Sequence, residues 1–268
     1  MVSISVQELI RVGAHFGHRT SRWNPKMAPY IFKKRNLIHI IDLKTTVRGL
    51  ITAKHVTEAI AARGKYVLFV GTKRQIQPIV RREAERCAVP YVADRWPGGL
   101  LTNYVTIRKR LDRLVELEDL ERSGEINNYS KKMISSLRRE RHKIERNLGG
   151  VRNMDRIPGL IVIIDPKREA IAVREGVKLG IPTVAWIDTD ADPDALDVVI
   201  PANDDAIGSV EVFLRTMADA VIEGRNRGGV TPPPRAAAEP EAEQKAEGAQ
   251  ETGVQGAASA ASDKTAEK

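Results

Sequence analysis

The chain has few of the residues on which several classes of protein depend. Its 268 residues include one cysteine, Cys87, which excludes an internal disulfide framework and a metal cage built from several cysteines. No apolar run approaches the length of about 18 residues that a membrane-spanning helix needs. The amino end also lacks an apolar secretion segment. We therefore expect a cytoplasmic protein that does not insert into a membrane.

Acidic residues are outnumbered by basic ones in most of the chain but not at its carboxyl end. The formal net charge is +8, from 43 Lys and Arg and 35 Asp and Glu. Residues 231–268 hold 4 of the basic and 7 of the acidic residues, which leaves 39 basic and 28 acidic residues in the rest. The same carboxyl-terminal segment has no leucine, isoleucine or aromatic residue. Because such a segment buries too little apolar surface to offset its ordering entropy, we expect a disordered tail over 229–268.

The basic excess is concentrated in two segments. Between Arg11 and Arg48 there are nine Lys or Arg and one acidic residue, Asp42. The second segment, 100–152, is most basic in the stretch SKKMISSLRRERHKIERN. A single charged run is often only a solvated helix face. Two of them in one basic body favour a polyanionic partner, because Lys and Arg displace condensed counterions from phosphates.

Apolar strand-like runs alternate with helical patterns along most of the chain. The predicted strands are 37–43, 65–71, 90–93, 159–165, 181–188 and 198–201, and the predicted helices are 6–13, 45–63, 74–88, 167–180 and 209–223. This alternation predicts an α/β fold with a doubly wound, mainly parallel sheet flanked by helices. Residues 14–36 have no period and contain two prolines, so we expect an irregular, cation-rich and ring-rich segment there.

One interval breaks the alternation. Residues 104–148 contain two apolar stripes at helical spacing, one formed by Ile107, Leu111, Leu114 and Leu117 and the other by Ile134, Leu137, Ile144 and Leu148. Two such helices joined by a polar turn fold back on each other as an antiparallel coiled-coil hairpin. We therefore expect a sheet domain made of 1–103 and 150–228, with a hairpin inserted at 104–149.

The chain has few signs of an active site. Gly71-Thr72-Lys73 follows a strand but lacks the first glycine of a phosphate-binding loop, and neither GxGxxG nor GxSxG occurs. A nucleotide-dependent enzyme is therefore a disfavoured alternative. The acidic loop 188–194 lacks the glycine and glutamate of a calcium loop. It is interpreted as a polar loop, with the alternative that a single Mg²⁺ or Zn²⁺ is held by some of His18, Asp188, Asp204 and Asp205.

Several short motifs occur in a fixed order along the chain. They are His15-Phe16-Gly17-His18, Trp23-Asn24-Pro25-Lys26-Met27, Ile40-Ile41-Asp42-Leu43, Phe69-Val70-Gly71-Thr72-Lys73, Arg95-Trp96-Pro97-Gly98-Gly99-Leu100-Leu101-Thr102-Asn103, Gly180-Ile181-Pro182-Thr183-Val184 and Ile200-Pro201-Ala202-Asn203-Asp204-Asp205-Ala206-Ile207. In this order they resemble the bacterial S-two family of small-ribosomal-subunit proteins. The resemblance covers residues 6 to 225, and Pro97 and the hairpin surface depart from the family's pattern.

The resemblance implies a non-enzymatic constituent of the small ribosomal subunit. Family members bind small-subunit (16S) rRNA and neighbouring ribosomal proteins where the head and body of the subunit meet, and they join late in assembly. Many bacterial members also anchor S-one, the OB-repeat protein that recruits mRNA. The resemblance therefore implies these partners, no required cofactor and no small-molecule substrate. A free-standing RNA-binding regulator remains the alternative among RNA-binding proteins.

The cations of the basic segments are the predicted RNA contacts. They are Arg19, Arg22, Lys26, Lys33, Lys34 and Arg35 near the amino end, Arg95 in the glycine-containing loop, and Arg138, Arg139, Arg141 and Lys143 in the hairpin. Trp23 or Phe16 could stack on an unpaired base, although either ring could instead pack against the sheet. The Arg95 loop could likewise present a cation to RNA, act as a hinge into the hairpin, or do both.

Overall fold

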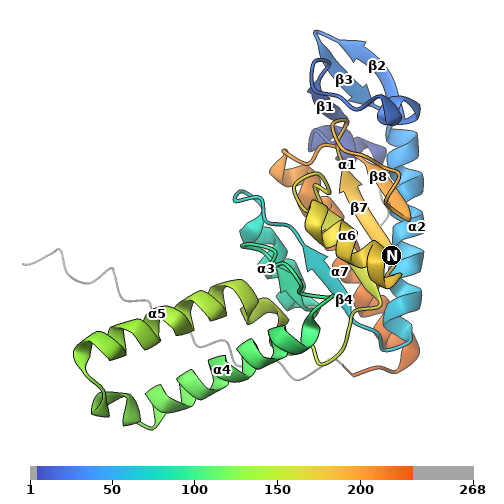
Figure 1. The fold of residues 1–268 in the computed structure, drawn as a ribbon. Coiled ribbons are helices and arrows are strands. Elements are labelled where there is room, and N and C mark those ends of the chain that lie inside the picture. Colours follow the sequence, from blue (N-terminus) through green and yellow to red (C-terminus); the bar gives the residue numbers. More distant parts are fainter. Residues whose placement is uncertain (1–4, 232–268) are drawn as a thin grey trace, which may run out of the picture. The chain divides into compact units, whose positions relative to one another are not determined.

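The computed structural model describes residues 5–231 (Figure 1). Its main sheet has five parallel strands in the order β5-β4-β6-β7-β8. They are β4 (Val67–Val70), β5 (Tyr91–Val92), β6 (Leu160–Ile164), β7 (Thr183–Ile187) and β8 (Val198–Pro201). Every residue of β4, β6 and β7 is buried, which is why these strands are continuous apolar runs without alternation.

Helices cover both faces of this sheet and confirm the doubly wound α/β fold. One face packs against α2 (Leu43–Ala62), α3 (Gln77–Arg86) and α7 (Ile207–Gly228), and the other packs against α6 (Ala170–Leu179). The short helix α1 (Val6–Arg11) joins the first layer through buried Leu9. No helix within 5–231 has an apolar stretch long enough to cross a membrane. Of the predicted tail, residues 232–268 lie outside the described residues.

The amino-terminal segment is ordered in a way that the sequence pattern did not predict. Strands β1 (Phe16–Arg19), β2 (Ile31–Arg35) and β3 (Ile38–Ile41) form a separate antiparallel sheet in the order β1-β3-β2, with a 3-10 helix η1 (Pro25–Tyr30) between β1 and β2. The prediction of an irregular segment over 14–36 is therefore wrong, and so is the assignment of 37–43 to the main sheet. Register shifts in both strand pairs break the period of two residues on which the prediction relied.

The inserted segment is a helical hairpin, as predicted. Helix α4 (Tyr104–Arg122) and helix α5 (Lys131–Leu148) run back along each other and are joined through η2 (Glu125–Asn128) (Figure 1). We call residues 104–148 the arm. Its far end has a small core of Leu117, Ile126 and Leu137, whereas Ile107, Leu111 and Leu148 join the core of the main sheet.

A buried carboxylate fixes the base of the arm. Glu175, on α6, accepts hydrogen bonds from the indole Nε1 of Trp96 (3.0 Å) and from the backbone N–H groups of Gly99 (2.8 Å), Leu101 (3.0 Å) and Thr102 (3.1 Å). The Thr102 hydroxyl donates a further bond at 3.1 Å. Burial opposes the ionisation of Glu175, but these hydrogen bonds outweigh burial and hold its pKa below the usual value.

We expect Glu175→Ala to lower the free energy of unfolding by about 3 kcal/mol, because buried N–H groups lose their acceptor. Urea unfolding of the whole chain measures this change. Glu145→Ala is the matched control, since Glu145 is exposed on α5 and forms no ion pair with any described residue. An equal effect of the two substitutions would contradict this role of Glu175.

The same carboxylate should make stability depend on pH. Because the folded-state pKa of Glu175 is lowered, its ionised form stabilises the protein above the ordinary value of 4.5, and this contribution is lost as the pH falls through the folded-state pKa. Glu175→Gln lacks this ionisation. Unfolding curves measured from neutral to acidic pH should therefore show the stability gap between the native chain and the glutamine variant narrowing as the pH falls.

Candidate nucleic-acid interface and cation site

The strand register of the small sheet gathers cations and a ring on one face. Phe16 and Lys33 both pair with Ile40, and Arg19 and Arg35 both pair with Ile38. Directly paired residues lie on the same side of a sheet, and positions two apart on a strand share a face. The two rows therefore form one surface, which we call the sheet face: Phe16, Arg19, Lys33 and Arg35 around Ile38 and Ile40.

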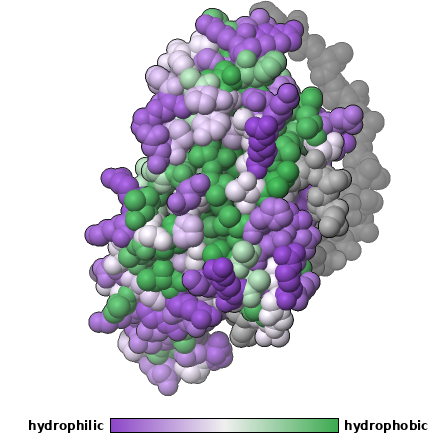
Figure 2. Space-filling view, turned by 90° about the vertical axis from the view of Figure 1, so that its right-hand side faces the viewer, coloured by the Kyte–Doolittle hydropathy of each residue, from purple (hydrophilic) through white to green (hydrophobic). Residues whose placement is uncertain are grey.

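The cations of this face have no ion-pair partner among residues 5–231, although Arg19 and Ile38 line one hollow together with Asp188 and Asp205. Phe16, Arg19, Lys33 and Arg35 are exposed, and none of the three cations forms an ion pair with a residue in 5–231. There is no Asp or Glu anywhere between Arg11 and Ile41. In the space-filling view, hydrophilic residues cover most of the end that carries the small sheet, and hydrophobic residues gather lower on the same side (Figure 2). The sheet face is thus a positive surface with an exposed ring.

The other candidates of the first basic segment have different surroundings. Trp23 packs on His39, with ring centroids 4.9 Å apart, on the opposite side of β3 from the sheet face. Lys34 pairs with that same His39 and remains exposed. Lys26 is neutralised within the chain, because its ammonium lies 2.8 Å from Asp192 and 2.5 Å from Asp194. Arg22 is exposed and borders a hollow of about 490 Å³ beside His18 and Arg19.

The arm also divides its cations into paired and free ones. Arg138 and Arg141, on α5, lie 3.0 and 3.2 Å from the two carboxylate oxygens of Glu121 on α4. Arg141 takes a position where an apolar residue would continue the seam, so this ion pair joins the helices there. Arg139 and Lys143 are exposed and form no ion pair with a described residue. Of the four predicted arm residues, these two have no ion-pair partner among the described residues, and all four stay predicted RNA contacts.

Among the exposed arm cations that the sequence-based assignment did not include, two share the helix face of Arg139. Lys132 and Arg146 are exposed and unpaired within 5–231, and they lie seven residues before and after Arg139. With Lys143 they form a line on the side of α5 that faces away from Leu137, which we call the outer stripe. The seven-residue spacing is visible in the sequence and could have found them, because such positions repeat on one helix face.

Arg95 lies at the start of the loop that Glu175 holds. It is exposed and forms no ion pair with a described residue, while the next residue, Trp96, is buried and donates its indole N–H to Glu175. The loop therefore holds the arm in place and presents a cation at the same time. Arg95 stays a predicted RNA contact, whereas the hydrogen bonds to Glu175 fix the loop and do not favour a hinge.

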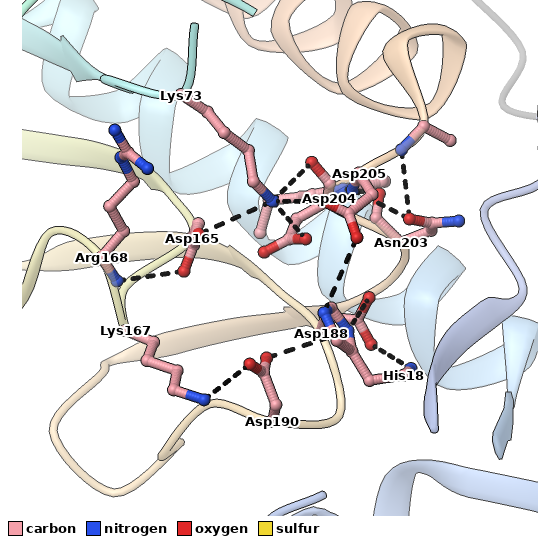
Figure 3. Close-up of polar contacts among 12 residues, drawn as sticks. His18, Lys73, Asp165, Lys167, Arg168, Asp188, Asp190, Asn203, Asp204 and Asp205 are labelled. Atoms are coloured by element: carbon pink, nitrogen blue, oxygen red, sulfur yellow. Dashed lines mark hydrogen bonds and ion pairs between the residues drawn. The ribbon is translucent and has the colours of Figure 1, made fainter. Parts of the chain in front are cut away.

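Ion pairs of the chain lie at the carboxyl edge of the main sheet. Parallel sheets of this kind bind ligands where the strand order reverses, which here is between β4 and β6. At that point the ammonium of Lys73 lies 2.8 Å from both Asp204 and Asp205 and 3.6 Å from Asp165 (Figure 3). Beside it, the backbone N–H of Thr72 donates to buried Glu169 at 3.0 Å. The cation and the carboxylates at this point are therefore already paired with one another.

Three of the four predicted metal ligands lie together at the same edge. His18, Asp188 and Asp204 each offer one ligand atom, and these atoms lie within 4.8 Å of one another (Figure 3). His18 Nδ1 is 2.9 Å from Asp188, which is almost fully buried. Asp205 is outside this group: it is 62% exposed, pairs with Lys73 and lies 3.6 Å from His18 Nε2. The two sheets meet at this cluster, since His18 belongs to β1.

Charge and burial shift the protonation of these groups in the chain without a bound ion. The hydrogen bond to Asp188 raises the pKa of His18 to about 9, so the imidazole is protonated at neutral pH. Burial, with the neighbouring carboxylate of Asp165, raises the pKa of Asp204 to about 7. A metal ion bound here would replace the proton of His18, because only a neutral imidazole ligates a metal.

Comparison with known proteins identifies the relatives of the chain. The family model for ribosomal protein S2 matches residues 9–224. The small ribosomal subunit protein uS2 of Rhodopirellula baltica is 54% identical over 242 residues, which cover 90% of this chain and 93% of the relative. The uS2 protein of Lawsonia intracellularis is 54% identical over 226 residues, or 84% of this chain and 77% of the relative. These relatives are structural proteins of the ribosome, which confirms the prediction of a protein that is not an enzyme. The chain belongs to the ribosomal protein S2 family.

Proposed function

We propose that the chain is a structural constituent of the small ribosomal subunit in the cytoplasm. In this function it binds small-subunit (16S) rRNA and neighbouring ribosomal proteins at the junction of head and body, joins late in assembly and supports translation. Family membership supports the assignment. The observation that carries it in this chain is the sheet face, where three unneutralised cations surround apolar side chains and an exposed ring.

The two cationic surfaces suit different parts of a folded RNA. On the sheet face, Arg19, Lys33 and Arg35 bind phosphates while Phe16 stacks on an unpaired base, a contact worth about 1–3 kcal/mol. Each ring packs on a histidine, Phe16 on His15 and Trp23 on His39, but Phe16 is better placed for this because it is exposed and Trp23 is only partly exposed. Arg22 and Lys34 flank this surface as further phosphate contacts, and Arg95 forms a separate one.

The outer stripe of the arm fits a run of phosphates. Lys132, Arg139 and Arg146 are seven residues apart, which at 1.5 Å per residue places them about 10 Å apart along the helix. They are held in a straight line because α5 is fixed to α4 by Glu121 and by its apolar seam. A rigid line of cations loses little conformational entropy when it binds, which favours a structured polyanion over a flexible one.

We also propose that the chain anchors S-one, the OB-repeat protein that recruits mRNA. What supports this partner is family membership, since no short motif of this sequence marks a docking surface for it. Immobilised full-length chain should retain S-one from solution. If S-one is retained by immobilised small subunits but not by the immobilised chain alone, another ribosomal component anchors S-one and the proposal is wrong.

Sedimentation tests the function as a whole. In a gradient at high magnesium concentration, a structural constituent co-migrates with small subunits in stoichiometric amount. A free-standing regulator would remain largely at the top of the gradient, and this result would overturn the proposal. Calorimetry with ATP, GTP and NAD tests the enzyme alternative, because a structural constituent whose Lys73 is paired with Asp165, Asp204 and Asp205 should bind none of these nucleotides.

Salt dependence tests the sheet face. Replacing Arg19, Lys33 and Arg35 by alanine should reduce the slope of log K against log salt by about 2 to 3 for 16S rRNA, since each lost phosphate contact removes about 0.7 to 0.9. The same replacement of Lys132, Arg139 and Arg146 tests the outer stripe. The measurement is filter binding or fluorescence anisotropy over a range of salt concentrations.

A matched control removes three cations that the chain already neutralises: Lys26, Arg82 and Arg138. This variant changes the net charge by the same amount, and we expect little change of slope. Circular dichroism establishes that each variant is folded. If the control and the sheet-face variant lose the same slope, binding depends on net charge alone and the assignment of the sheet face is wrong.

We propose in addition that His18, Asp188 and Asp204 bind one divalent cation, although the fold requires no cofactor. Their ligand atoms are close enough to share an ion. One nitrogen and two carboxylate donors suit Zn²⁺ with an open fourth position, whereas Mg²⁺ prefers oxygen ligands in an octahedron. Lys73 bonds to one oxygen of Asp204, so the ion would be shared through the other oxygen.

Equilibrium dialysis against ZnCl₂ followed by metal analysis tests this site. We expect one zinc per chain at neutral pH, with weaker binding at lower pH because protons compete for His18. Asp188→Asn should weaken binding by at least about tenfold, and Asp155→Asn, at an exposed carboxylate remote in sequence from the site, should not. Absence of stoichiometric zinc and magnesium from the native chain would remove the proposal.

A further inference from the structure

The turn between β2 and β3 has an unusual residue at its tip. Asn36 and Leu37 both have left-handed backbone conformations, with φ of 47° and 61°. A two-residue hairpin turn of this kind commonly has the sequence Asn-Gly, because glycine has no Cβ to collide with the backbone in that region. Asparagine tolerates the conformation, but leucine does so only with strain. Leu37 therefore occupies a position where glycine would be more stable.

In the free chain, the Leu37 side chain is not buried enough to compensate for this strain. Its side chain is 66% exposed, so few of its methyl and methylene groups are removed from water. The strained conformation is maintained through the backbone, since the Leu37 carbonyl accepts a hydrogen bond from the Thr20 N–H at 2.9 Å. An asparagine–glycine turn could keep this backbone contact without either disadvantage. The leucine side chain is thus presented outward on a fixed backbone, which suits a contact with another molecule.

The surroundings of the tip indicate the chemistry of that molecule. Arg35 ends β2 immediately before the turn, and Arg19 lies across Ile38 from Arg35 on the sheet face. Neither arginine forms an ion pair with a residue in 5–231, although the fold brings Asp188 and Asp205 to the hollow that Arg19 lines. A partner surface that tolerates these cations is polyanionic. Because RNA combines phosphates with exposed bases in its loops and helix ends, it offers both the charge and the flat apolar surface that this tip requires.

We propose that Leu37 is an RNA-contacting residue that packs on an exposed base of small-subunit rRNA while Arg19 and Arg35 hold adjacent phosphates. This inference rests on the proposed function and adds a residue to its binding surface. The strained turn aims the side chain in advance, so that RNA binding does not have to order it. Because the Leu37 contact is apolar, its contribution to RNA affinity should not depend on salt, whereas the phosphate contacts of the sheet-face cations should.

The test is Leu37→Gly in the full chain, with 16S rRNA as the probe. Relief of backbone strain should raise the melting temperature of the free protein, by about 2–4 °C, while loss of the apolar contact weakens RNA binding by about fivefold. The slope of log K against log salt should stay unchanged, because no phosphate contact is lost. Arg35→Ala should instead reduce that slope.

Two further variants make the result specific. Leu37→Asn keeps a residue that tolerates the turn but removes the apolar surface, so it should bind RNA as weakly as the glycine variant. Val177→Ala removes part of a side chain that is 56% exposed on α6 and should bind like the native chain. Native affinity in both Leu37 variants would overturn the inference, and so would a weakened affinity accompanied by an altered salt slope. Failure of the native chain to bind the RNA would instead refute the proposed function.

Discussion

The carboxylate of Glu175 is the contact on which the placement of the arm depends. A loop between a sheet strand and a long helix exposes several backbone N–H groups that have no partner of their own. Here one buried side chain from α6 accepts three of them, together with the Trp96 indole and the Thr102 hydroxyl. The loop from Arg95 to Asn103 is therefore fixed to the main sheet, and so are the arm's cations. A long cationic helix on a flexible joint would lose much more entropy on binding a structured partner.

Ion pairs at the carboxyl edge of the main sheet hold the small sheet in a fixed position on it. The crevice between β4 and β6 holds Lys73 and its carboxylates, and the cluster of His18, Asp188 and Asp204 joins the small sheet to the main one. In related folds this edge is open to ligands. In this chain the polar groups at this edge pair with one another and stabilise the contact between the two sheets.

Ion pairing divides the predicted RNA contacts into two groups. Lys26, Arg138 and Arg141 are each within an ion-pair distance of a carboxylate, whereas Arg19, Lys33, Arg35, Arg139 and Lys143 have none among the described residues. Net charge cannot make this distinction, because all eight contribute equally to it. The unpaired cations accordingly form smaller surfaces than the basic segments that contain them.

The sequence by itself determined the alternating elements of the main sheet, the helical arm and the family. Long apolar runs such as LIVII and stripes such as Ile107-Leu111-Leu114 indicate burial. Burial of this kind can be predicted from the residue types along the sequence. It did not predict the small sheet, because register shifts near Phe16 and Ile31 hide the period of a strand. Only the tertiary structure decided which cations share a face with Phe16, which are held by Glu121 or Asp192, and that Glu175 fixes the arm. These outcomes depend on pairs of residues far apart in sequence, and the distance between two side chains is set by the fold rather than by either residue.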